Sequence, residues 1–233
     1  MNKNILFCAL IFLAGALQAA ESNPKDDITA AATKLADKAN YSWKTTIVVP
    51  ESSPFRPGPT EGELEKDGIT HITMSYGDNT TQVFMKGDKA AVTNPNGGWL
   101  SLAEMDQSEG PSRFIGMLIK NFKNPAAQAM ELAAGAKALK QDSDVYSGDL
   151  TEAAAKALIM FRRATDGPAV SNAKGSVNVW IKDGLLAKYE FAVKGTMKFN
   201  DNEMEIDRTT TVEIKNVGTT KVTVPEEAKK KLT

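Results

Sequence analysis

GSVNVWIKDGLLAKYEFAVKGTMKFNDNEMEIDRTTTVEIK, residues 175–215, is the stretch that decides the fold. It predicts three successive strands, over Ser176–Lys182, Leu185–Phe199 and Met204–Lys215, joined by Asp183-Gly184 and by a cluster of Asn and Asp, both typical of tight turns. At about 3.3 Å per residue, the middle strand would reach about 50 Å, well beyond the usual ~17–20 Å. Because strands twist, so long a strand cannot lie in a flat sheet, and the sheet must curl.

The two long strands each have an apolar face and a polar face. Side chains alternate between the faces of a strand, so residues of one parity share a face. The third strand has Arg208 and Thr210 as interruptions in its apolar row. The apolar rows are Ala187, Tyr189, Phe191, Val193, Met197 and Phe199 in the middle strand and Met204, Ile206, Val212 and Ile214 in the third.

Charge pairing selects between two registers for these strands. A turn at Asn200-Asp201 places Lys194 opposite Asp207, whereas a turn one residue later places Glu190 opposite Glu213. Opposite charges across a strand pair stabilise it and like charges destabilise it, which favours the first register. Both registers keep the apolar rows together, so the sheet has a face that something must cover.

The amino-terminal segment predicts export. Met1–Ala20 has Lys3 near its start, an apolar run over Ile5–Leu17 and small residues at its end, as a secretory signal peptide does. We expect cleavage after Ala19 or Ala20, with Ala16 as the alternative site.

The cysteine content and the net charge limit the expected compartment and the kinds of partner. The only cysteine, Cys8, lies within the predicted signal peptide, so the mature chain should have neither a disulfide nor a lipid-anchored cysteine. Exported domains without disulfides favour a bacterial periplasm, with secretion as the alternative. The formal net charge of −1 gives no long-range attraction to nucleic acid or to an anionic membrane.

The remaining chain alternates between strand and helix patterns. An amphipathic helix over Asp27–Ala39 precedes a strand over Tyr41–Val49 with an aromatic inner face. Hairpin signals then follow in close succession. They separate short strands at Glu61–Lys66, Ile69–Ser75, Thr80–Lys86, Lys89–Thr93 and Trp99–Leu102.

The central region and the carboxyl end add helices and two more strands. Helices are predicted over Pro111–Phe122, from Asn124-Pro125 to about Ala133, and over Thr151–Arg163. Asn124 is predicted to cap the second of these helices and Thr151 the third. The other predicted elements are strands at Lys137–Ser147 and Thr220–Val224 and a tail helix over Pro225–Leu232.

Strands, then helices, then strands predict an α+β fold. We expect about eleven strands in a strongly curved antiparallel sheet, with the helices packed in its concave face. No linker divides the chain, so residues 21–233 are predicted to form one domain with a helical insertion at about 103–163.

The order of elements resembles that of the periplasmic lipoprotein carrier LolA and of the LolB and LppX/LprG-type lipid-binding proteins. The features that carry it are the leading helix, the strand Tyr41–Val49, Gly98-Trp99 before a helical insertion, the long carboxy-terminal strands and the closing Val222-Thr223-Val224-Pro225. The resemblance implies an unclosed half-barrel with a lipophilic cavity between sheet and helices. It includes no diagnostic motif, so no functional residue is transferred from these families.

Residues suited to catalysis, metals or cofactors are scarce. The single histidine, His71, lies in mid-strand, where a two-residue turn at Asp67-Gly68 would place it opposite Leu64, and no Gly-x-Ser-x-Gly motif is present. We predict no catalytic residue, metal site or cofactor. Glu61, Glu63 and Glu65 share a strand face and are best interpreted as solvated charges on an edge strand.

The candidate ligand-binding residues are apolar and soft. Methionine and aromatic side chains suit surfaces that repack around varied lipophilic ligands, although they also form ordinary cores. We predict a carrier of a lipid or of a lipoprotein acyl chain; the alternative is a non-enzymatic envelope interaction or sensor module with a filled core. Arg113 and Arg162-Arg163 are candidates for binding an anionic head group; the alternative is that they are solvated charges on helices. The predicted lining is Trp43, Met85, Trp99, Phe114, Met117, Leu118, Leu158, Phe161, Tyr189, Phe191 and Met197.

Overall fold

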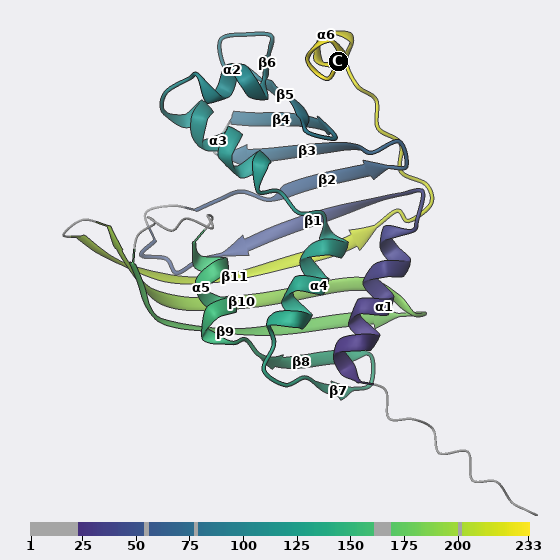
Figure 1. Ribbon diagram of the computed structural model, residues 1–233, viewed down its shortest axis with the longest axis vertical. Helices are drawn as coiled ribbons and strands as arrows, with labels where there is room; N and C mark the ends of the chain where they lie inside the picture. The colour runs from purple at the N-terminus through teal and green to yellow at the C-terminus, as the bar shows by residue number, and fades with distance from the viewer. Residues whose placement is uncertain (1–22, 54–55, 77–78, 161–168, 200–201) are drawn as a thin grey trace, which may run out of the picture.

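The computed structural model describes residues 23–53, 56–76, 79–160, 169–199 and 202–233, so the predicted signal peptide lies outside them. Within these residues, eleven strands form one open antiparallel sheet in the order β6-β5-β4-β3-β2-β1-β11-β10-β9-β8-β7 (Figure 1). The predicted α+β half-barrel is therefore confirmed. The strands are β1 (Asn40–Val48), β2 (Thr60–Glu65), β3 (Ile69–Tyr76), β4 (Asn79–Lys86), β5 (Lys89–Thr93), β6 (Trp99–Ser101), β7 (Lys140–Asp142), β8 (Val145–Asp149), β9 (Ala169–Lys182), β10 (Leu185–Phe199) and β11 (Asn202–Lys215).

Five helices contribute to the main core on one face of the sheet, and α6 packs on the other face. Helices α1, α4 and α5 cross one face over β9 and β10, and α2 and α3 lie near β3–β6 (Figure 1). Asn23, Asn124 and Thr151 each cap the helix that follows, the last two as predicted. The helices are α1 (Pro24–Ala36), α2 (Leu102–Asp106), α3 (Pro111–Lys120), α4 (Pro125–Gly135), α5 (Glu152–Ile159) and α6 (Glu226–Lys231).

The register of β10 and β11 is the one that charge pairing predicts. Lys194 lies opposite Asp207, with Nζ and Oδ2 2.9 Å apart. Val193 and Tyr189 from the predicted apolar row are buried. A register shift between Leu186 and Lys188 then turns Leu186 inward, to 1% exposure, although alternation alone places it on the polar face.

Two predicted strands differ in the structure. The strand predicted over Lys137–Ser147 is a hairpin, β7 and β8, because Ser143 adopts a left-handed backbone conformation (φ 55°) that allows a tight turn. The segment predicted as a strand over Thr220–Val224 pairs with no strand among the described residues. Its polar groups bond to loop and side-chain atoms instead, as in the Val222 N–H that donates to Glu65 Oε2 (3.2 Å).

A second, smaller core lies on the outer face. Phe84, Ala91, Val224 and Ala228 are buried together there, so α6 covers the outer side of β4–β6. The main core lies between the helices and the inner face of the sheet. Both faces of β4 and β5 are therefore covered, which explains the continuous buried apolar runs Val83-Phe84-Met85 and Ala90-Ala91-Val92.

Candidate functional site

The structure separates the predicted lining residues into three groups. Trp43, Met85, Tyr189 and Phe191 are buried in the main core. Met117, Leu118, Leu158 and Met197 are partly exposed, and Phe114 is 49% exposed. Trp99 lies in the outer-face cluster, with its ring 5.5 Å from that of Phe84, and Phe161 falls outside the described residues.

The lower half of the concave face is occupied by the protein itself. Helices α1, α4 and α5 pack on β9 and β10, leaving Tyr189 1% and Phe191 5% exposed. The Tyr189 hydroxyl donates to Gln128 Oε1 of α4 at 2.6 Å. Burial raises the pKa of Tyr189 well above its usual value, so the hydroxyl stays protonated. This half of the hollow is core.

The middle of the concave face is organised around Trp43 of β1. Its ring stacks on Phe122 (centroids 6.2 Å apart) and is tilted against Tyr41 (5.9 Å). It lies over Gly62 of β2, where an added Cβ would stand 2.0 Å from a ring carbon. Only glycine permits this approach. Phe122 follows α3 directly, so the stack joins the sheet to the end of that helix.

Helix α3 carries apolar side chains on two sides. Ile115 and Ile119 pack against the main core. Phe114, Met117 and Leu118 lie together on a different side at i, i+3 and i+4 spacing and remain exposed or partly exposed. The polar face expected of a surface helix is thus narrow. We call Phe114, Met117 and Leu118 the outer stripe of α3.

Arg208 explains one interruption of the apolar row in β11. Its guanidinium reaches the concave face and donates to the backbone oxygen of Leu158, in the last turn of α5. Burial lowers the pKa of Arg208. An arginine at this place satisfies a carbonyl that the helix end leaves unpaired, which is a structural role. Arg113 is exposed on α3, and Arg162 and Arg163 lie outside the described residues.

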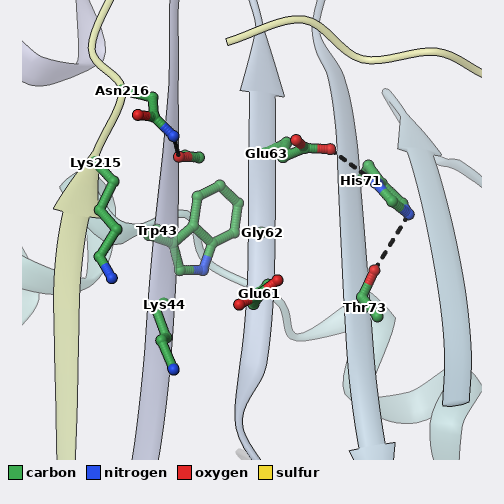
Figure 2. Close-up of a pocket in the computed structure, with 10 residues that line it drawn as sticks. Trp43, Lys44, Glu61, Gly62, Glu63, His71, Thr73, Lys215 and Asn216 are labelled. Atoms are coloured by element: carbon green, nitrogen blue, oxygen red, sulfur yellow. Dashed lines mark hydrogen bonds and ion pairs between the residues drawn. The ribbon is translucent and has the colours of Figure 1, made fainter.

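A polar pocket of about 320 Å³ lies on the outer face of β1–β3 (Figure 2). His71 faces Glu63 and not Leu64, because the turn has three residues and ends in Gly68 with φ +76°. His71 Nδ1 lies 2.9 Å from Glu63 Oε2, and His71 Nε2 lies 3.4 Å from Thr73 Oγ1.

The Glu63 carboxylate and the Thr73 hydroxyl lie at the two ring nitrogens of His71 and hold the ring in place. The ring also stacks on Phe84, with centroids 4.3 Å apart. The backbone N–H groups of β2 and β3 that bond across the ladder are not free to stabilise an oxyanion. β2 is an inner strand between β1 and β3, so the prediction that Glu61, Glu63 and Glu65 lie on an edge strand was wrong.

The described residues contain neither a cluster of metal ligands nor a membrane-spanning helix. No group of three or more His, Cys, Asp or Glu side chains there could hold a metal ion. No helix among those residues is long and apolar enough to span a membrane.

The fold and the concave face define a class of protein: an open antiparallel half-barrel whose inner face is partly core and partly lined by a helix with a surplus of apolar side chains. No family model matches the sequence, and no curated protein matches it.

Solved structures show a distant similarity to this chain, with TM-scores below 0.5. LprF from Mycobacterium bovis has a TM-score of 0.45 and 11% identity, covering 88% of this chain and 97% of that one. The Mycobacterium tuberculosis lipoprotein LppX has a TM-score of 0.46 and 10% identity, covering 84% and 94%. A LolA superfamily protein from Nitrosomonas europaea has a TM-score of 0.35 and 10% identity, covering 87% and 96%.

Proposed function

We propose that the protein is an exported carrier or binder of a lipophilic ligand, a lipid or a lipoprotein acyl chain, which it holds between the sheet and α3. The observation that carries this proposal is the outer stripe of α3, which is exposed or partly exposed on a different side of the helix from Ile115 and Ile119, the partly buried residues that pack against the main core. A helix with apolar side chains on two sides can turn or lift and still bury one of them. The proposed site does not include Tyr189 and Phe191, because helices of the protein already cover these two predicted lining residues.

The energetics suit an acyl chain in this position. Each buried CH2 group contributes about 0.8 kcal/mol, so a chain of about 12 carbons offers about 9 kcal/mol before any cost of moving α3. Few inter-element contacts have to break, because α3 packs chiefly on α2, through Gly116 and Met105. The salt bridge from Lys120 to Asp106 (2.6 Å) is exposed and contributes at most about 1 kcal/mol.

The place of action follows from the signal peptide that Met1–Ala20 resembles. We propose a periplasmic protein, with secretion as the alternative. Its partners would be a lipophilic small molecule or a lipoprotein, with no part for nucleic acid, a catalytic residue or a cofactor.

A second function has its own supporting observation. The half of the concave face in front of β9 and β10 is filled. If the other half closes equally well in solution, the protein is a non-enzymatic interaction or sensor module of the cell envelope. Its contacts would then be with protein partners.

The test is to extract purified protein with organic solvent and to analyse the extract by mass spectrometry. We expect a recurrent lipid species, and its loss in Ile115→Gln, which places an amide against the core side of α3. The control is Val48→Ser, because Val48 is 61% exposed and lies on β1. Empty extracts, together with no thermal stabilisation by added lipids, would overturn the proposal and favour the interaction module.

A further inference from the structure

The three longest strands extend beyond the rest of the sheet. β11 pairs with β10 as far as Asn202, whereas its pairing with β1 ends at Val48. In Figure 1, β9, β10 and β11 accordingly run past the end of β1. Pro50 then begins a turn, in which its carbonyl accepts from the Ser53 N–H at 3.0 Å. Among the described residues, no strand pairs with this side of β11 over residues 202–207, which we call the open edge of β11.

The open edge is regular, whereas the corresponding edge of β9 is not. β9 also extends beyond its neighbour, because β8 pairs with it only from Ser176 onward. There the register with β10 shifts between Lys194 and Thr196, and Asn172 adopts a left-handed conformation (φ 54°). Bulges of this kind prevent another strand from pairing. The open edge of β11 keeps one register with β10, and its six described residues include no proline, no glycine and no positive φ. It can therefore accept a further strand.

Alternate backbone groups of the open edge point away from β10. Only two residues separate Phe199 from Asn202, and these two lie opposite each other. In a hairpin with so short a turn, the pair beside the turn exchanges ladder hydrogen bonds, as does every second pair after it. The N–H and C=O groups that point outward are thus those of the residues between these pairs, which are Glu203, Glu205 and Asp207.

Apolar side chains lie beside this edge. Met204 and Ile206 share the inner face, where Ile206 packs against the main core and Met204 is 43% exposed. Val48, at the end of β1, is 61% exposed, and among the described residues only Phe114 is a comparably exposed large apolar side chain. Exposed apolar side chains next to an unpaired strand indicate an interaction surface.

An acidic row lies on the outer face of the same edge. It consists of Glu203, Glu205 and Asp207. β10 places Lys198 opposite the first of these carboxylates and Lys194 opposite the third, and the Glu205 carboxylate between them accepts from the Thr196 hydroxyl at 3.0 Å. A carboxylate has several acceptor positions, so each can also accept a charged donor from the open side. Basic side chains on an added strand would be attracted there, and a second copy of this acidic row would be repelled.

We propose that the open edge of β11 binds an extended peptide of a partner protein, which adds a strand antiparallel to β11, as β1 does. The outward backbone groups supply the affinity, and the two rows of side chains supply the specificity. The peptide carries basic side chains on the outer face, beside the acidic row, and apolar side chains on the inner face, beside Met204. This surface is distinct from the site at α3 and does not depend on lipid binding.

The experiment measures the binding of fluorescein-labelled peptides to the purified protein by fluorescence anisotropy. The basic probe is the acetylated and amidated heptapeptide KVKVKVT, and the acidic probe has glutamate in place of each lysine. Two further probes are the basic peptide with N-methyl groups on its lysines or on its valines. In the proposed pairing the lysines lie opposite the outward backbone groups, so only their N–H groups face β11. We expect the basic peptide and its N-methyl-valine form to bind at least tenfold more tightly than the other two.

Glu205→Lys reverses the charge at the centre of the acidic row and leaves the backbone unchanged. We expect it to weaken binding of the basic peptide about fivefold and to strengthen binding of the acidic peptide, because one cross-strand charge pair changes sign. The matched control is Glu227→Lys, which makes the same change of charge at an exposed position of α6 and should leave both affinities unchanged.

Several results would overturn the proposal. Equal binding of the basic and acidic peptides, no effect of N-methyl groups on the lysines, or no binding of any peptide would each do so. Dimers of the peptide-free protein in analytical ultracentrifugation, lost when the basic peptide is added, would assign the edge to a second copy instead. Solvent extraction tests the carrier function separately, so either proposal can fail while the other stands.

Discussion

Replacing Gly62 by alanine tests how the middle of the concave face is packed. The new Cβ would lie 2.0 Å from Cζ2 and 2.1 Å from Cε2 of Trp43, so the indole ring has to move. Trp43 is 5% exposed and held between Tyr41 and Phe122, and it cannot move without disturbing the stack. Overpacking a core costs about 1–3 kcal/mol, and so direct a clash with a ring belongs at the upper end. We expect Gly62→Ala to lower the free energy of unfolding by about 3 kcal/mol.

The assay is urea unfolding followed by circular dichroism, in a double-mutant cycle with Trp43→Leu. Leucine lacks the ring atoms that the added Cβ would meet, so in that background the cost should vanish or become a gain of about 0.5–1 kcal/mol, because glycine is unfavourable inside a strand. Glu61→Ala, at the neighbouring outward position, should change stability by less than about 0.5 kcal/mol. An equal cost of Gly62→Ala with and without the indole would refute this account of the packing.

Three further predictions concern titrating groups and the outer core. The folded-state pKa of Tyr41 is raised from 10.0 to about 12, so the contribution of the neutral hydroxyl to folding stability is complete below pH 10.0 and is lost as the pH rises toward 12. Tyr41→Phe should remove about 3 kcal/mol of this alkaline loss of stability, measured by urea unfolding at several pH values. An unchanged alkaline profile in the variant would contradict this prediction. The pKa of Glu104 is lowered from 4.5 to about 2, by Lys231 first and then by Ser101. The ionised Glu104 carboxylate therefore stabilises the fold above pH 4.5, and this stabilisation is lost as the pH falls toward 2. The melting temperatures of the wild type and Glu104→Gln should converge in that range, and a constant difference would contradict the prediction. Phe84→Ala should cost about 3–5 kcal/mol and expose α6 to limited proteolysis, whereas protection of α6 in the variant would show that the outer cluster does not hold it.

The long carboxy-terminal strands could be predicted because two independent patterns agree there. Alternation gives the faces of β10 and β11, and the charges decide the register, as the pairing of Lys194 with Asp207 shows. Alternation predicts the wrong face for Leu186, because a register shift beside it turns its side chain inward and the local sequence gives no signal of that shift. Helix α2 was missed, although Ser101 and Glu104 form a capping box that the sequence displays.

The site was harder to predict, because the alternation of side chains along a strand does not say which helix packs on which face of the sheet. Trp99 is predicted to line the hollow, yet α6 covers the outer side of β4–β6 and Trp99 is partly buried in the cluster there. The continuous apolar run Ala90-Ala91-Val92 is the signal that both faces are covered.

We propose that a lipophilic ligand lies between α3 and the sheet. Amide hydrogen exchange of the purified protein, with and without saturating dodecanoate or dodecyl phosphate, tests it directly. We predict added protection in α3 and in the segment 121–126, with little change in β9 and β10, whose inner face α1, α4 and α5 already cover. Protection that is unchanged in α3, or that rises only at the outer pocket around His71, would contradict the claim.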